Sequence, residues 1–142
     1  WTVQLNEAVL AAPAPVVLVA HSLGCILTAW WASSAPPAVV GKVQAALLVA
    51  PGDVEQADLR QHLPGWAPIA RQRLPFAAVV VGSQNDPYCR LARAQQLAAD
   101  WGAQWVDAGA AGHINSASQL GDWPQGHALL QDLVKDSVHG KR

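Results

Sequence analysis

The chain has 142 residues, enough for one packed domain and too few for two of ordinary size. Half of it (51%) is apolar and only 13% is charged, which excludes an intrinsically disordered chain. A formal net charge of -1 and the shortness of the apolar runs predict no nucleic-acid partner and no membrane partner. Because Cys25 and Cys89 are too few for a disulfide framework, we expect a reducing, cytoplasmic location.

Short apolar strands and helices alternate along the chain. In order, we expect a helix over 1–11, a strand over 16–20, a helix over 23–34, a strand over 44–50, an irregular or partly helical excursion over 54–75, a strand over 76–82, a helix over 91–100, a strand over 103–107 and a helix over 122–138. This alternation is typical of an α/β domain with a mostly parallel sheet and helices on both faces. We expect a single domain over 1–142, with its ligand site beyond the carboxyl ends of the strands.

The first strand is followed by the string AHSLG, residues 20–24, and then by a helix. It differs by one residue from the G-x-S-x-G nucleophile elbow, in which a strained strand-to-helix turn exposes a serine hydroxyl. Small residues are needed on both sides of the turn because strand and helix approach closely there, and Ala20 and Gly24 satisfy this need. Ser22 is therefore the candidate nucleophile, and the N–H of Leu23 is a candidate donor to an oxyanion.

Two further candidates follow later strands. Asp86 comes after the third strand and precedes Pro87, which favours an extended backbone suited to an orienting acid. His113 lies on a glycine-flanked loop after the fourth strand and is the candidate base. The order Ser, Asp, His is the order of the α/β-hydrolase triad.

Other residues compete for these roles. Asp53 also follows a strand and is the substitute acid, whereas Asp107 is expected to be structural. His21 is expected to pack or hydrogen-bond locally, and the remaining histidines, His62, His127 and His139, are expected at the surface. The two cysteines lack metal-ligand spacing, so we expect them to be buried and predict no metal and no organic cofactor.

The chain resembles the small single-domain serine hydrolases related to retinoblastoma-binding protein nine, within the α/β-hydrolase superfamily. The strings that carry the resemblance are LVAHSLG (18–24), LVAPGD (48–53), SQNDPYC (83–89), AGHIN (111–115) and LGDWPQG (120–126). The resemblance covers essentially the whole chain. It implies hydrolase activity on small acyl substrates, with a triad at Ser22, Asp86 and His113.

The chain also departs from that family. Ala20 replaces the first glycine of the elbow, which is a mild steric change. Family members begin with a strand and a glycine-containing loop that supplies the second oxyanion N–H. Because the chain as written begins at Trp1, we expect that N-terminal strand and half of the oxyanion hole to be missing. We also expect an open, apolar sheet edge that is prone to association.

These observations predict a serine hydrolase that cleaves a small acyl ester, thioester or amide through an acyl-serine intermediate. The alternative is a protein-binding module that keeps a hydrolase fold with little or no turnover. The expected partner is a small acyl substrate, with a protein partner or self-association left open. The triad does not distinguish a hydrolase from an acyltransferase, which differs only in the acceptor.

Overall fold

The computed structural model describes residues 2–13, 15–115 and 123–138. Its elements are α1 (Thr2–Ala11), β1 (Val16–His21), α2 (Leu23–Ser34), α3 (Pro37–Val40), β2 (Val43–Val49), α4 (Ala57–His62), β3 (Ala77–Gly82), α5 (Leu91–Trp101), β4 (Gln104–Asp107) and α6 (Pro124–Val138). The four expected strands and the four expected long helices are all present. The short helix α3 is an addition, whereas α4 lies inside the excursion that was expected to be partly helical.

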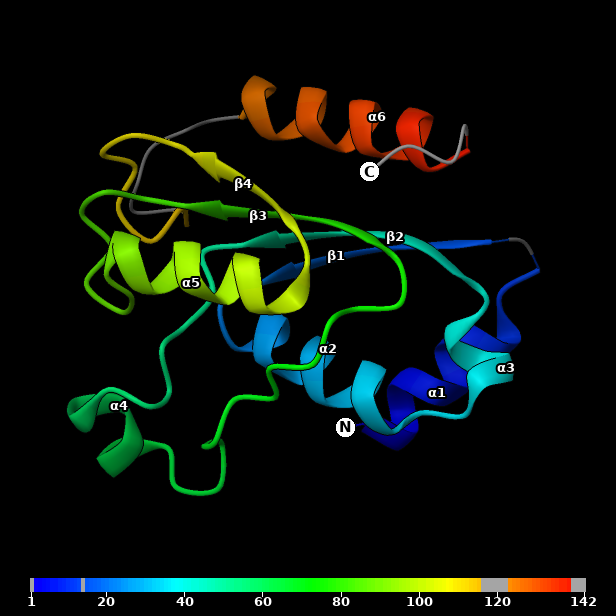
Figure 1. Cartoon of the computed structure of the whole chain (residues 1–142), viewed down its shortest axis with the longest axis horizontal. Helices are drawn as coiled ribbons and strands as arrows, with labels where there is room; N and C mark the ends of the chain where they lie inside the picture. The colour runs from blue at the N-terminus through cyan, green and yellow to red at the C-terminus, as the bar shows by residue number, and fades with distance from the viewer. Residues whose placement is uncertain (1, 14, 116–122, 139–142) are drawn as a thin grey trace.

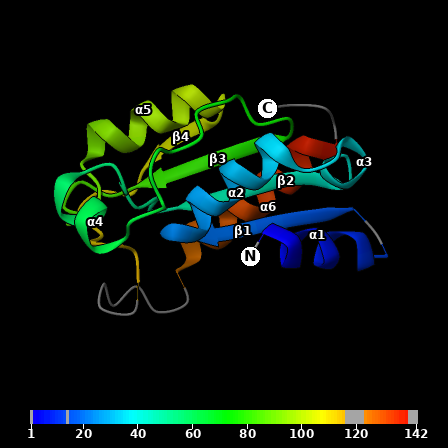
Figure 2. The same cartoon turned by 90° about the horizontal axis from the view of Figure 1, so that it is seen from below.

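The four strands form one parallel sheet in the order β1-β2-β3-β4. Helix α6 packs on β2 and β3 from one face, whereas α2 and α5 cover the opposite face (Figure 1). The view from below shows the same three layers, with α6 behind the sheet and α2 in front of it (Figure 2). The predicted parallel sheet with helices on both faces is confirmed.

The core lies in two parts, one on each side of the sheet. Because side chains alternate along a strand, Ala46, Leu48 and Val80 join the cluster on the side of α2 and α5. Leu47 and Val79 join the cluster beneath α6. Every residue of β3 is buried, as expected for a central strand of a covered parallel sheet.

Strand β1 lies at the end of the sheet. Within the part of the chain that the structure describes, β1 pairs with β2 alone. Val19 faces the side of the sheet that α6 covers over β2 and β3, and it remains 61% exposed. Among the described residues, no strand pairs with the outer side of β1, and this edge is partly apolar.

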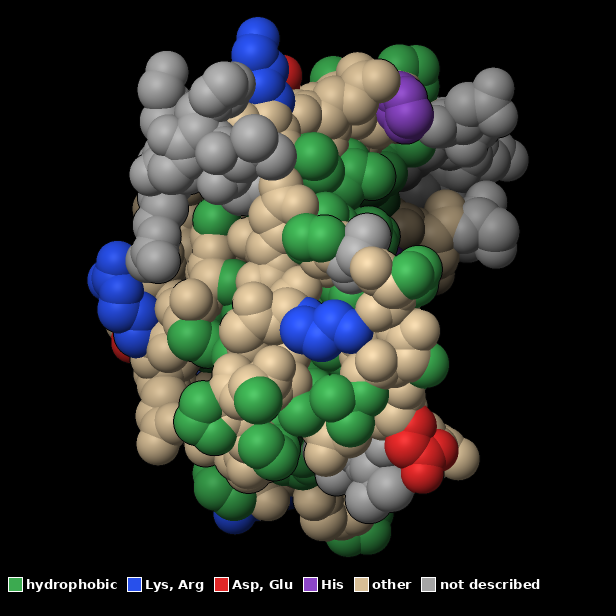
Figure 3. Space-filling view, turned by 90° about the vertical axis from the view of Figure 1, so that its right-hand side faces the viewer, with side chains coloured by type: hydrophobic (Ala, Val, Ile, Leu, Met, Phe, Trp, Pro, Cys, Tyr) green, Lys and Arg blue, Asp and Glu red, His purple; other side chains and the backbone are tan. Residues whose placement is uncertain are grey.

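All four strands run in the same direction, so their carboxyl ends share one edge of the sheet (Figure 1). Figure 3 faces the opposite end, where the strands begin, and shows Lys and Arg side chains at several separate places. Among the described helices, none is long and apolar enough to cross a bilayer.

Candidate active site

Ser22 sits at the corner between β1 and α2. Its backbone has φ 57° and ψ -117°, the strained conformation expected of the elbow. The N–H of Ser22 donates to the carbonyl of Val49 at 3.0 Å, which ties the corner to β2. A Cβ added at Gly24 would lie 3.5 Å from the Cβ of Ala20, which is an ordinary contact. Strand and helix therefore leave just enough room for alanine at position 20.

Asp86 lies in the turn after β3, and its side chain is 1% exposed. One carboxylate oxygen, Oδ1, accepts the N–H of Tyr88 at 2.9 Å, which fixes the rotation of the carboxylate. The same oxygen lies 3.0 Å from Nδ1 of His113, and Oδ2 lies 2.9 Å from that nitrogen. A carboxylate can only accept hydrogen bonds, so Nδ1 of His113 carries the proton in this arrangement.

The other nitrogen of His113 faces Ser22. Nε2 lies 2.8 Å from Oγ of Ser22, within reach of the hydroxyl proton. With its proton on Nδ1, the imidazole presents a lone pair at Nε2, to which the serine hydroxyl donates. The structure thus brings Ser22, Asp86 and His113 into one line of hydrogen bonds, although they lie up to 91 positions apart.

The loop that carries His113 is fastened by the residues just before Asp86. Oδ1 of Asn85 accepts the N–H of Gly112 at 2.7 Å. Oγ of the buried Ser83 accepts the N–H of Ala111 at 3.0 Å and donates to Oδ1 of Asn85 at 3.0 Å. Sequence analysis did not assign these roles to Ser83 and Asn85. The sequence signal that could have indicated these roles is that both residues lie close to the candidate acid in the string SQNDP.

Two rings flank the imidazole of His113. The ring of Tyr88 meets it edge-on, with centroids 4.7 Å apart. The ring of His21 lies at the same centroid distance, and its Nε2 is 2.8 Å from the backbone oxygen of His113. A local contact was expected for His21, but its partner lies 92 positions away in the sequence.

Comparison with known proteins shows the family to which the chain belongs. Residues 1–132 match the model of the family described as "Serine hydrolase". The chain belongs to that family. No curated protein sequence is significantly similar to this serine hydrolase.

Solved structures share its fold. One, assigned as a YdeN-like hydrolase from Pectobacterium atrosepticum, is 25% identical with a TM-score of 0.81, and the match covers 96% of this chain and 69% of that one. A second structure, assigned as a hydrolase of the α/β superfamily from Xanthomonas campestris, is 22% identical with a TM-score of 0.62. The match covers 93% of this chain and 68% of that one. The type II thioesterase BorB from the borrelidin biosynthetic cluster is 17% identical with a TM-score of 0.63, over 94% and 69%.

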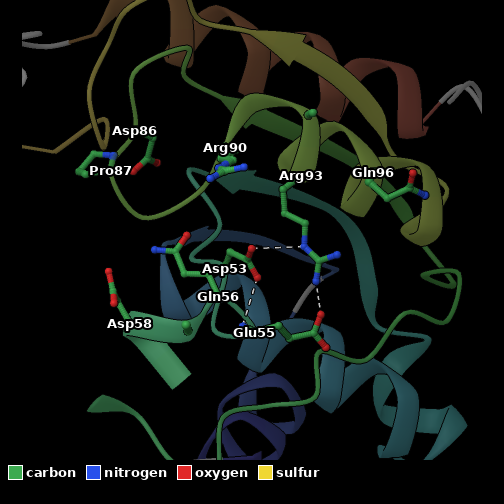
Figure 4. A pocket seen from close by; sticks show the side chains of 11 residues that line it. Asp53, Glu55, Gln56, Asp58, Asp86, Pro87, Arg90, Arg93 and Gln96 are labelled. Atoms are coloured by element: carbon green, nitrogen blue, oxygen red, sulfur yellow. Dashed lines mark hydrogen bonds and ion pairs between the residues drawn. The ribbon is translucent and has the colours of Figure 1, made fainter. Parts of the chain in front are cut away.

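The substitute acid, Asp53, belongs to a separate group of charges in this serine hydrolase. Its Oδ2 lies 3.4 Å from Nε of Arg93, which also forms an ion pair with Glu55 (Figure 4). Glu55 forms a second ion pair with Arg71. Although burial opposes it, the N–H of Ile69 together with both guanidinium groups holds the pKa of Glu55 below its ordinary value. The helix α5 is thus joined to the excursion by charge.

A cavity of about 830 Å³ lies beside this group, between the start of α5 and the segment that leads into α4. Figure 4 shows Asp86 and Pro87 at one side of it, and Arg93 with Asp53 and Glu55 at another. The buried carboxylate that orients His113 therefore also borders a charged cavity.

The remaining sequence candidates lie outside the triad. Asp107 is exposed; its bonds to Gln84 and to the N–H of Gly109 hold its pKa below the ordinary value. Both cysteines are free and buried, and burial raises the pKa of both thiols, that of Cys89 to about 12. No cluster of potential metal ligands occurs among the residues that the structure describes. His139 lies outside the described residues.

Proposed function

We propose that this serine hydrolase cleaves a small acyl ester, thioester or amide through a covalent intermediate on Ser22. The observation that carries the proposal is the hydrogen-bonded line from Asp86 through His113 to Ser22, with distances of 2.8–3.0 Å. Nucleophile, base and orienting acid are all within the reach that acyl transfer requires. The strained corner that exposes the hydroxyl adds independent support.

The reaction follows from the proton positions. As Oγ of Ser22 attacks the substrate carbonyl carbon, its proton passes to Nε2 of His113, and the Asp86 carboxylate stabilises the imidazolium. When the tetrahedral intermediate collapses, the leaving group takes that proton and the acyl group stays on Ser22. His113 then removes a proton from water, which attacks the ester, and the acid is released as the proton returns to Oγ.

The N–H of Leu23 is the proposed donor to the oxyanion. Leu23 is the first residue of α2, and the first N–H groups of a helix lack partners within the helix. The positive end of the helix dipole favours negative charge at the same place. A single donor of this kind is worth on the order of 10²–10³ in rate.

The acyl class is supported by fold relatives whose names include a type II thioesterase and a carboxylesterase. Two free, buried thiols suit a reducing compartment, and we propose a cytoplasmic location. The open, partly apolar edge of β1 favours the alternative of a binding module without turnover. Turnover separates the two proposals.

The test is labelling by a fluorophosphonate probe together with hydrolysis of p-nitrophenyl esters of increasing chain length. We expect the wild type to be labelled and S22A to be neither labelled nor active. S33A is the matched control, since Ser33 lies at the exposed end of the same helix, where its hydroxyl bonds the carbonyl of Trp30. Labelling of S22A at the wild-type rate would overturn the assignment of the nucleophile, and an inert wild type would favour the binding module.

A further inference from the structure

His21 is a histidine beside the nucleophile that the proposed reaction does not use. It is the last residue of β1, its side chain is exposed, and its Nε2 lies 2.8 Å from the main-chain oxygen of His113. A carbonyl oxygen can only accept, so Nε2 of His21 is the donor. The bond joins the strand that ends at the nucleophile directly to the residue that is the proposed base.

The residues on both sides of His113 have a left-handed backbone, which a hydrogen bond to this loop helps to hold. Gly112 has φ 60° and Ile114 has φ 51°. A left-handed backbone is easy for glycine but costs free energy for a β-branched residue. Asn85 and Ser83 accept the N–H groups of Gly112 and Ala111, which precede His113. His21 donates a hydrogen bond to the carbonyl of His113 itself. The loop is therefore held by hydrogen bonds both before His113 and at its own carbonyl.

The rings restrict the same side chain. His21 lies at 57° to the imidazole of His113, and Tyr88 lies at 62° to it, both with centroids 4.7 Å away. Rotation of the imidazole would break its bonds to Asp86 and Ser22 together, and the two flanking rings oppose that rotation. The ring packing and the hydrogen bonds thus oppose the same rotation of the imidazole.

We propose that His21 is a positioning residue for the base, acting through its Nε2–H bond to the His113 carbonyl and through ring contact. This inference rests on the proposed function, because a positioning role has meaning only where His113 accepts a proton from Ser22. It gives His21, the residue that precedes the nucleophile, a role in positioning the base. Loss of this bond should lower the rate of acylation rather than the affinity for substrate.

The experiment compares H21Q, H21N and H21L in the full chain, with a p-nitrophenyl ester as substrate. The amide nitrogen of glutamine reaches about as far as Nε2 of histidine, whereas that of asparagine falls short. Because a misplacement of about 1 Å can cost ~10²-fold in rate, we expect H21N and H21L to lose at least ~10-fold in kcat with KM changed less than ~3-fold. We expect H21Q to recover most of that loss. If H21L does not fold, the two amide variants still form a matched pair.

H62L is the control, because His62 is also exposed and its ring also bonds a backbone carbonyl, that of Asp58 in its own helix. A second readout is independent of turnover: the downfield NMR resonance of the Nδ1 proton that His113 shares with Asp86. We expect this signal to persist in H21Q and H62L and to shift or broaden in H21N and H21L. An inert wild type would refute the proposed function, and the NMR comparison would still decide the role of His21. An unchanged kcat and an unchanged resonance in H21L would overturn the inference.

Discussion

Replacing Asp86 by asparagine tests the triad with almost no change of shape. Oδ1 of Asp86 accepts the N–H of Tyr88, so the amide oxygen of the variant must stay at that position. The amide NH₂ group then takes the place of Oδ2, 2.9 Å from Nδ1 of His113. The amide oxygen, 3.0 Å from Nδ1, still offers an acceptor, but the NH₂ group then faces a second donor at 2.9 Å, and this repulsion favours the tautomer in which Nδ1 carries no proton. The neutral imidazole then carries its proton on Nε2, the nitrogen that faces Ser22, and it can no longer accept the serine proton.

A base held in the wrong tautomer loses about 10⁴ in kcat. At 1.36 kcal/mol for each factor of ten, this is about 5 kcal/mol of lost transition-state stabilisation. The assay is the rate constant of fluorophosphonate labelling beside kcat for a p-nitrophenyl ester, with the melting temperature as a check on folding. D86N should be labelled several orders of magnitude more slowly than the wild type.

The matched control is D53N, the same chemical change in the loop after the neighbouring strand. Asp53 bonds Arg93 and the N–H of Glu55 rather than the imidazole, so D53N should keep its labelling rate within several-fold. A D86N variant that labels at the wild-type rate would refute the tautomer argument. A large loss in D53N with none in D86N would move the role of the acid to Asp53.

Three further predictions concern Glu55, Ser83 and the two cysteines. The folded-state pKa of Glu55 is lowered, so its charge stabilises the fold above its ordinary pKa and this contribution is lost as pH falls through the folded-state value. E55Q should therefore cost about 1 kcal/mol or less at pH 7, and thermal melts of wild type and variant should converge in acid. S83A removes the hydroxyl that accepts the buried N–H of Ala111, which should cost about 1 kcal/mol of unfolding free energy in urea and lower kcat. Cys25 and Cys89 should resist iodoacetamide until the protein is unfolded, because the thiolate is the reactive form.

Each of these has its own control. An E55Q melting curve that stays below that of the wild type at every pH would show that the charge of Glu55 is not the stabilising feature. S34A is the comparison for S83A, since Ser34 bonds a carbonyl at the exposed end of α2, and equal losses would exclude a special role for the buried serine. Rapid alkylation of the native protein at either cysteine would contradict its burial.

The fold could be predicted because strand ends and helix starts are determined by residues close to them in the sequence. The β-branched run of β1, the small residues around Ser22 and the proline after Asp86 each act on their own neighbourhood. The parallel sheet then brings the ends of distant strands together. The start of α3 at Pro37 was missed because a double proline that stops one helix can also occupy the first turn of the next.

The contacts between loops could not be predicted in the same way. Periodicity tells which face of an element a residue occupies, but not which residue of another loop it meets. His21 and the carbonyl of His113 are 92 positions apart, and Arg93 meets Glu55 across 38 positions. The charged group around Arg93 depends on the path of the excursion, which no local pattern fixes.

The helix α4 has no buried residue, whereas Val54 before it and Ile69 after it are almost fully buried. Its chain is thus anchored at both ends and loosely held between them, which is where a protease finds its first cut. A trypsin nick after the exposed Arg60 would separate β1 and β2 from β3 and β4. Ser22 would then belong to one fragment, and Asp86 with His113 to the other. Activity in the nicked protein would report whether the pairing of β2 with β3 and the packing of α6 on β2 keep two polypeptides working as one enzyme.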